Sequence, residues 1–418
     1  MAKSLPLETL QEIFSYQTGR LASCACVCRQ WQLAAERFTF ADLHISSADL
    51  EDFRQMFPVS NSAGRRFHLR SLHFKINLPK YGIAARGQYE DQYDRDTNSN
   101  VFTQAITSLF KILSSWPEYD RYMSLQIYAR SPSSDWQAEP DWTTRRARLE
   151  RGRAFPEEEL LQRRYQDSYL QLRGKIALRD VKCITSLDVM GCDNFRNIAP
   201  GAVSEMVVHL PRLQTVTATL RDKVRNGPEM GDSDSLGDYS PHSTPGPNSR
   251  SLALQQIIQQ LENVDLTETT IGPDLFWPVD ANHTTPFWPN LIKLTIMYSS
   301  NSASRGQPPD LTDEQLQTPL KSKDLDELSL AAGRAAQHMP RLQSMEIDLS
   351  LPSVPTAHYY FIYIATLGKV PWAVTSQFYV SKKTQQVWDV AARRHGNSLP
   401  SVEVCDMDTY SSDSSSFS

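Results

Sequence analysis

A pattern of apolar positions recurs along this 418-residue chain: an apolar residue, two intervening residues, a second apolar residue, and then strict alternation. Alternation of this kind is typical of a β-strand that buries one face. The second apolar position of each copy, which we call the anchor, falls at Leu72, Leu125, Leu187, Val216, Leu294 and Met345. The pattern therefore predicts six similar strands, each of which buries its anchor side chain.

Helical patterns precede several of these strands. Apolar residues recur at helical spacing over 101–115, 203–209, 252–261 and 325–338. Three strands also share a proline-containing lead-in: LPRL at 210–213, WPNL at 288–291 and MPRL at 339–342. Proline ends a helix because it lacks an amide donor and clashes with the preceding turn. A repeated helix–strand unit indicates stacked repeats that share a continuous core.

The spacing of the anchors is irregular. Successive anchors are separated by 53, 62, 29, 78 and 51 residues, whereas regular leucine-rich repeats run about 20–29 residues. The closest match to such a repeat is LDVMGC at 187–192. We interpret the chain as an α/β protein with degenerate, insertion-bearing repeats. The alternative is an ordinary α/β domain whose strands share a buried-strand pattern.

The first forty residues predict a separate helical unit. Pro6 suits the first position of a helix, and Glu8 in the first turn favours the helix dipole. A second helix is expected from about Arg20, with one apolar face at Leu21, Cys24 and Cys28 and another around Trp31. A unit of about 40 residues is too small to be stable alone without further support. One of the two apolar faces is therefore expected to contact another domain or protein.

These residues also resemble a known family. The motif residues are Leu5-Pro6-x-Glu8, Leu10, Ile13-Phe14, Leu21, Val27-Cys28-Arg29 and Trp31. In this order and at about these spacings the segment resembles an F-box, over 35–40 residues. The loop 16–20 departs from the pattern, because many members carry an apolar residue and a proline there.

The resemblance implies a function. F-box proteins are substrate receptors of Skp–cullin–F-box ubiquitin ligases, in which the F-box docks on the Skp adaptor and the rest of the chain holds the substrate. By resemblance, the positions that make or support the adaptor surface are Leu5, Pro6, Leu10, Ile13, Val27, Cys28 and Trp31. The alternative for each residue is a place in the small helical core. For the protein, it is a non-degradative scaffold that binds the Skp adaptor without cullin.

F-box proteins often continue into leucine-rich repeats, which is consistent with the repeated strands. In such a solenoid the side chains between the buried strand positions face the concave binding surface. The candidate substrate contacts are His73, Lys75, Gln126, Tyr128, Asp188, Met190, Thr295 and Glu346. Their mixed character identifies no particular protein substrate, and each alone could be a plain exposed strand residue.

The predicted organisation has three parts. Residues 1–42 form the F-box, 43–405 form a leucine-rich-repeat-like substrate-binding domain, and 406–418 form a disordered Ser-rich tail. A second disordered segment is expected near 222–249, which collects Gly, Pro, Asp and Ser. The strand-like run 359–374 and the amphipathic helix 380–394 are expected to cap the last repeat, or to bind a partner. The charged segment 139–165 is expected to be an exposed face or an insertion.

Composition excludes several function classes. The chain has 43 Lys+Arg against 48 Asp+Glu, so a global basic field for nucleic-acid binding is absent. No apolar segment reaches the length of about 20 residues that a membrane helix needs, and no secretory signal follows the N-terminal lysine. We therefore expect a cytoplasmic or nuclear protein that contacts neither nucleic acid nor membrane.

Catalytic and metal-binding motifs are also missing. The sequence lacks phosphate-binding glycine motifs, HExxH and GxSxG. Cys24, Cys26 and Cys28 lack a second Cys/His pair, and alternate positions of one helix do not converge, so we interpret them as small buried core residues. We expect a non-catalytic ligase subunit without cofactor or metal, and a plain enzyme is the least favoured alternative.

Overall fold

The structure is a computed structural model. It describes residues 5–17, 21–58, 63–82, 85, 88–116, 122–134, 164–165, 168–174, 177–191, 196–220, 254–255, 257–267, 273–277, 285–298, 323–350, 358–365, 370–373, 380–396 and 402–405. The chain divides into two compact units, Met1–Leu213 and Gln214–Ser418. Each unit is described by itself.

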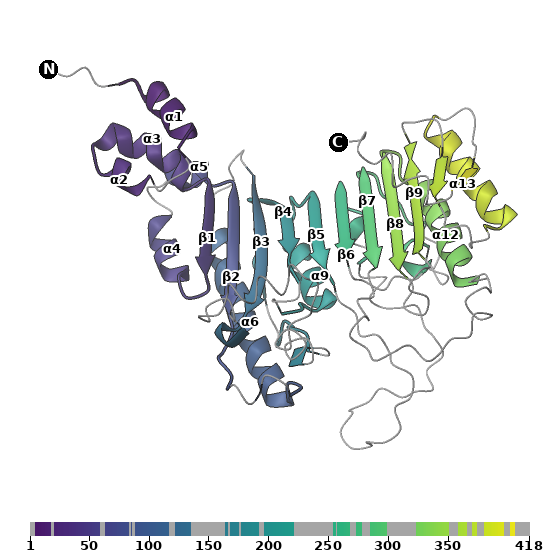
Figure 1. The fold of residues 1–418 in the computed structure, drawn as a ribbon, viewed down its shortest axis with the longest axis horizontal. Coiled ribbons are helices and arrows are strands. Elements are labelled where there is room, and N and C mark those ends of the chain that lie inside the picture. The colour runs from purple at the N-terminus through teal and green to yellow at the C-terminus, as the bar shows by residue number, and fades with distance from the viewer. Residues whose placement is uncertain are drawn as a thin grey trace, which may run out of the picture. The chain divides into compact units, whose positions relative to one another are not determined.

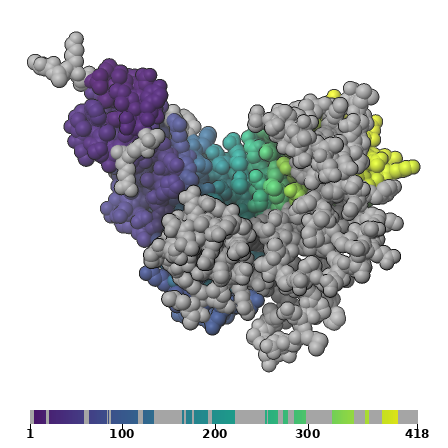
Figure 2. Space-filling model, in the orientation of Figure 1, coloured from purple at the N-terminus to yellow at the C-terminus, as the bar shows by residue number. Residues whose placement is uncertain are grey.

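The first unit begins with three helices, which form a compact body (Figure 2). They are α1 (Leu7–Ser15), α2 (Ala22–Ala25) and α3 (Arg29–Thr39). Cys28, in an extended conformation, precedes α3 and separates it from α2. The single second helix expected from Arg20 is therefore wrong: it is two helices, because the backbone leaves helical geometry at this residue.

Four parallel strands follow in chain order (Figure 1). They are β1 (Asp42–Ser46), β2 (Ser71–Asn77), β3 (Met123–Arg130) and β4 (Ile184–Val189). The predicted anchors Leu72, Leu125 and Leu187 stand directly opposite one another and are fully buried. The strands that the sequence pattern predicted are therefore present, and their register, which the pattern does not specify, aligns the anchors in one row.

Helices complete the first unit. They are α4 (Leu50–Met56), α5 (Ala63–His68), α6 (Gln92–Ser114), the 3-10 turn η2 (Pro132–Ser134) and α9 (Pro200–Val208). The side chain of Asp91 caps α6 by accepting a hydrogen bond from the Asp94 amide at 2.7 Å. One face of α6 buries Phe102, Ile106, Leu109 and Phe110, so this helix contributes a large share of the apolar core.

The second unit repeats the strand arrangement with one reversal. Its strands are β5 (Thr215–Thr219), β6 (Asn263–Thr267), β7 (Lys293–Tyr298), β8 (Ser344–Ser350) and β9 (His358–Ile364). The first four are parallel and β9 is antiparallel to β8. Val216, Leu294 and Met345, the predicted anchors, are buried in one row. Val264 of β6, which is not among the predicted anchors, stands between Val216 and Leu294.

The remaining elements of this unit lie toward the C-terminus. They are η4 (Pro273–Leu275), α12 (Lys323–Ala336), β10 (Val370–Ala373), α13 (Lys382–Arg394) and β11 (Val402–Cys405), which pairs in parallel with β10. Trp388 of α13 is fully buried and packs on Phe361 and Tyr363 of β9, with ring centroids 4.8 and 5.1 Å away. The helix expected over 380–394 therefore packs on the last strand of the sheet.

These elements confirm the mixed α/β class, the N-terminal helical unit and the six predicted strands. The solenoid and the domain boundaries stay predictions. The expectations for 222–249 and 406–418 lie outside the described residues, as does nearly all of 139–165. Among the helices of the described part, none combines the length and apolar character of a membrane span.

Candidate functional site

The three N-terminal helices enclose a small apolar core. Leu10 and Phe14 of α1 pack with Leu21, Ala34 and Ala35, and all five are buried. The Phe14 and Trp31 rings meet edge to face, with centroids 5.5 Å apart. The carbonyl oxygen of Leu5 accepts a hydrogen bond from Gln30 Nε2 at 2.7 Å, so the chain ahead of α1 is fastened to the start of α3.

The predicted adaptor-binding residues divide into two groups. Leu5, Ile13 and Val27 are large apolar side chains that remain 44%, 42% and 61% exposed. Pro6 and Cys28 are also exposed. By contrast, Leu10 is fully buried and Trp31 is half-buried against the core. Leu10 and Trp31 therefore support the helical unit from inside, and the first group supplies its apolar surface.

The interpretation of the cysteines needs correction. Cys24 packs against the core as expected, but Cys26 and Cys28 are exposed. The reason is the turn between α2 and α3, which carries these two residues away from the helix face that Cys24 occupies.

A row of polar side chains crosses the outer face of the first unit. His44, His73, Gln126 and Asp188 are direct partners on successive strands β1 to β4. His73 Nδ1 lies 2.5 Å from Gln126 Oε1, and Gln126 Nε2 donates to Asp188 Oδ2 at 2.6 Å. Three of the predicted substrate contacts are thus joined in one hydrogen-bonded row.

A second row runs beside the first. Lys75 of β2 stands opposite Tyr128 of β3, and both are half-buried. Met190 follows β4, and its amide donates to the Ile127 carbonyl at 3.0 Å, which continues the ladder. The structure therefore brings the six predicted contacts of the first unit onto neighbouring strands, although whether they bind a substrate stays a prediction.

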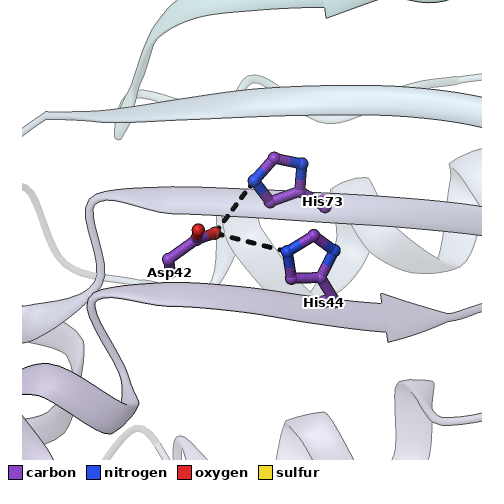
Figure 3. Close-up of side chains that lie close together, drawn as sticks. All are labelled: Asp42, His44 and His73. Atoms are coloured by element: carbon purple, nitrogen blue, oxygen red, sulfur yellow. Dashed lines mark ion pairs between the residues drawn. The ribbon is translucent and has the colours of Figure 1, made fainter. Parts of the chain in front are cut away.

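Near the start of this face, β1 and β2 bring together three side chains of metal-binding type (Figure 3). Asp42 Oδ1 lies 2.9 Å from His73 Nε2 and 3.7 Å from His44 Nε2. The two imidazole rings are stacked, with centroids 4.0 Å apart and an angle of 5° between their planes. Sequence reasoning missed this cluster because His44 and His73 are 29 positions apart and share no motif.

The two predicted contacts of the second unit differ in accessibility. Thr295 of β7 and Glu346 of β8 are direct partners, and Glu346 is half-buried. Thr295 is only 6% exposed, which contradicts the expectation that it offers an accessible contact. The short threonine stands between Asp265 and Glu346 on the adjacent strands, so longer neighbours flank it.

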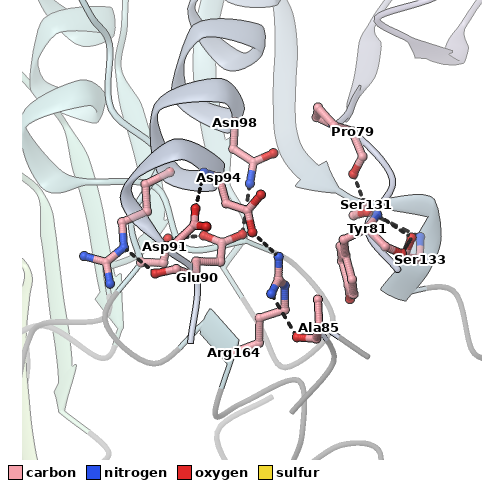
Figure 4. Close-up of polar contacts among 12 residues, drawn as sticks. Pro79, Tyr81, Ala85, Glu90, Asp91, Asp94, Asn98, Ser131, Ser133 and Arg164 are labelled. Carbon is pink, nitrogen blue, oxygen red and sulfur yellow. Dashed lines mark hydrogen bonds and ion pairs between the residues drawn. The ribbon is translucent and has the colours of Figure 1, made fainter. Parts of the chain in front are cut away.

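A network of charged and polar side chains surrounds the start of α6, and Figure 4 labels Glu90, Asp94, Asn98 and Arg164 among its members. The carboxylate of Glu90 accepts hydrogen bonds from Arg196, Ser168 and Asn98, and Arg196 Nη2 lies 2.7 Å from Glu90 Oε2. Glu90 and Arg196 are each 2% exposed. The network fastens segments more than 70 positions apart, and we assign it a structural role.

Arg164 extends this network and corrects one expectation. Its Nη2 donates to Asp94 Oδ2 at 2.6 Å, and its guanidinium lies 4.3 Å from the Tyr81 ring centroid. The segment 139–165 is expected to be an exposed face or an insertion, and Arg164, at 2% exposure, contradicts an exposed face at this position. The half-buried carboxylate of Asp94 and the aromatic face of Tyr81 compensate this buried charge.

Two family comparisons match parts of the chain. Residues 2–42 are similar to the F-box-like family, and this range coincides with α1 to α3. Residues 255–415 are similar to a family of unknown function, DUF6546, and lie within the second unit. No curated protein matches the chain. The N-terminal match supports the F-box resemblance, whereas the C-terminal match gives no support for leucine-rich repeats.

Proposed function

We propose that this protein is a substrate-recognition subunit of a Skp–cullin–F-box ubiquitin ligase. The helices α1 to α3 dock on the Skp adaptor and, through it, on cullin. The polar face of the strands β1 to β4 receives a protein substrate, with repeat-like stacking of helices and strands as its scaffold. The chain itself contributes binding rather than catalysis, in the cytoplasm or the nucleus.

One observation carries the proposal: the F-box-like match falls on a helical unit that exposes large apolar side chains. Leu10 and Phe14 already supply the core of this unit, so its fold does not require Leu5, Ile13 and Val27 to be apolar. Exposing such residues costs solvation free energy, and groups of them mark protein-binding surfaces. Burial against the Skp adaptor would remove this cost.

The test is co-purification of the Skp adaptor with the variant Leu5→Ala/Ile13→Ala/Val27→Ala. Loss of capture by a chain with unchanged circular dichroism is the expected result, because three exposed contacts are truncated without a core cavity. Trp31→Ala is a poorer choice, since Trp31 packs on Phe14 and its loss would disturb the fold itself.

Val208→Ala is the matched control. Val208 is 71% exposed and lies on α9, outside residues 2–42. It should retain full adaptor capture. Undiminished capture by the triple variant would exclude these residues as the docking surface. Recovery of cullin in the same pulldown distinguishes a ligase subunit from a scaffold that binds the Skp adaptor alone.

The proposed substrate face consists of the two rows of side chains on β1 to β4 described above. Its side chains include His73, Lys75, Gln126 and Asp188, which offer both donors and acceptors but no dominant charge. Such a surface suits a polar protein segment rather than a nucleic acid, whose phosphates require many cations. Cross-linking from Lys75, compared with Lys111 on α6, tests whether ubiquitylated proteins contact this face.

A further inference from the structure

A chain of hydrogen bonds fixes the state of the His73 ring. The NH2 group of Gln126 points toward Asp188, since Gln126 Nε2 donates to Asp188 Oδ2 at 2.6 Å. The Gln126 carbonyl oxygen is then the atom that faces His73 Nδ1 at 2.5 Å. Nδ1 must therefore carry a proton. In a neutral imidazole the other nitrogen, Nε2, keeps its lone pair.

That lone pair faces a carboxylate oxygen. Nε2 of His73 lies 2.9 Å from Asp42 Oδ1. Two lone pairs at this distance repel each other unless a positively charged species stands between them. The Ser71 hydroxyl, 3.1 Å from the same nitrogen, can donate to Nε2 but leaves the contact with Asp42 unrelieved. The geometry thus requires either a proton on Nε2 or a cation shared with Asp42.

His44 favours the cation. Its Nε2 approaches the same oxygen of Asp42, and its ring is stacked on His73. Both Nε2 atoms thus converge on one carboxylate oxygen, and a single metal ion can accept a lone pair from each of the three side chains. Imidazole nitrogen and carboxylate oxygen are the ligand types preferred by Zn²⁺ and neighbouring transition metals.

The positions of the ligand atoms are compatible with one ion. All three lie within 4.8 Å of one another, and two ligands of a tetrahedral Zn²⁺ stand about 3.3 Å apart. The difference can be closed by side-chain rotation, because His44 and Asp42 are 64% and 61% exposed. His73, at 20% exposure, is the ligand that the hydrogen-bonded row holds in place.

We propose that Asp42, His44 and His73 form a binding site for a divalent transition-metal ion of the Zn²⁺ class. Gln126 is a positioning residue, since its bond to Nδ1 directs the His73 lone pair at the ion. Three protein ligands leave a fourth, solvent-facing position for water or for a side chain of a bound molecule. This assignment is independent of the F-box proposal, because it uses only β1 to β3.

The test is metal binding by the full-length chain, purified with a tag that contains no histidine. We expect about one equivalent of Zn²⁺ per chain by calorimetry and elemental analysis after dialysis. Co²⁺ in place of Zn²⁺ should give the visible absorption of nitrogen and oxygen ligation. A thiolate charge-transfer band would instead assign the ion to exposed thiols such as Cys26 and Cys28, and would overturn the proposal.

Variants locate the site. His44→Gln should abolish tight binding without disturbing the fold, because this side chain is largely exposed. Gln126→Leu should weaken binding by about 10–100-fold, as removal of an outer hydrogen-bond partner typically does. The matched control is His209→Gln: His209 pairs with Asp180 at 2.9 Å, and in the described part of the chain no third ligand-type side chain joins them.

The outcomes are distinct. Binding that survives His44→Gln and Asp42→Asn, or that falls equally in His209→Gln, would overturn the site. Absence of binding by the wild type would likewise overturn the proposal. Loss of metal with intact adaptor capture would support the site and leave the F-box proposal untouched.

Discussion

Gly333 is a position at which a neighbouring side chain, Trp388, leaves no room for a larger residue. A methyl group added there would stand 2.8 Å from Trp388 Nε1, closer than atoms in contact allow. Trp388 cannot move away easily, because it is fully buried and its Nε1 donates to the Ser329 carbonyl at 3.0 Å. The absence of a side chain at 333 therefore permits α12 and α13 to pack closely.

Gly333→Ala should lower the free energy of unfolding by about 1–2 kcal/mol, because overpacking exceeds the gain in helix propensity. Urea unfolding measures this change. Gly201→Ala on α9 is the control, since no atom lies within 4 Å of the added methyl group, and it should be neutral or slightly stabilising. Equal stability of the two variants would contradict the packing argument.

For single residues, the sequence predicted the burial of the strand anchors better than the exposure of polar residues. The anchors Leu72, Leu125 and Met345 were found because burial imposes an apolar side chain at every second position. Thr295 and Arg164 were misplaced, because a threonine or an arginine is compatible with either environment. Their burial depends on neighbours such as Asp94, which is 70 positions from Arg164.

At the scale of elements, a buried ion pair holds distant segments against α6. Glu90 precedes α6 and binds Asn98 of that helix, while Arg196 and Ser168 reach it from distant segments. Glu90 and Arg196 are both buried, so each compensates the other for the loss of hydration.

Glu90→Gln should therefore cost about 3–5 kcal/mol, because Arg196 is left as a buried charge without its carboxylate. Thermal or urea unfolding of the variant measures the loss. The double variant Glu90→Gln/Arg196→Met should recover part of it, and Glu51→Gln, in the exposed pair with Arg54, should change stability little. A loss no larger than that of Glu51→Gln would show that the buried pair is not needed.

His395 joins β9 to the helices of the second unit. Its Nδ1 lies 2.5 Å from the Tyr363 hydroxyl and its Nε2 lies 3.0 Å from the Met339 carbonyl oxygen, an arrangement that suits a neutral ring. Burial, with a smaller effect from Arg394, lowers the pKa of His395. Burial and Arg394 also lower the pKa of His338.

The unfolded chain consequently binds protons on these histidines at a higher pH than the folded chain does. Their contribution to stability should be complete above about pH 6.5 and should decrease as the pH falls through the lowered pKa values. The midpoint of thermal unfolding should drop between about pH 7.5 and pH 5.5. His395→Gln should reduce this drop, and an unchanged pH dependence would contradict the assignment.

The predicted strands do not include β1 and β6. Asp42–Ser46 and Asn263–Thr267 each have two apolar residues, as the predicted strand β5 does, so the number of apolar residues does not distinguish them. They become strands by pairing with neighbours: Leu43 stands opposite Leu72, and Val264 opposite Leu294. A short segment gains its structure from this pairing rather than from its own propensity.

At the scale of the whole molecule, the division into two units predicts that adaptor capture and the stability of the second unit can be changed separately. The F-box-like match and the exposed Leu5, Ile13 and Val27 belong to Met1–Leu213, whereas Gly333 and Trp388 belong to Gln214–Ser418. Mutations without shared contacts usually act additively.

We therefore expect Gly333→Ala to destabilise the chain while it still captures the Skp adaptor. Conversely, Leu5→Ala/Ile13→Ala/Val27→Ala should lose capture without the fall in unfolding free energy that Gly333→Ala produces. Capture assays and unfolding curves on the same two preparations provide the measurement. Loss of adaptor capture by folded Gly333→Ala protein would indicate coupling between the units.

The sequence by itself determined the α/β class, the six anchored strands and the N-terminal helical unit, because apolar periodicity and local motifs are properties of neighbouring residues. Only the tertiary structure decided the convergence of Asp42, His44 and His73, the burial of Arg164 and the exposure of Cys26. The convergence depends on strand register, the burial of Arg164 depends on contacts with distant segments, and the exposure of Cys26 depends on the turn between α2 and α3. Register sets which side chains meet across parallel strands, and no local pattern records it.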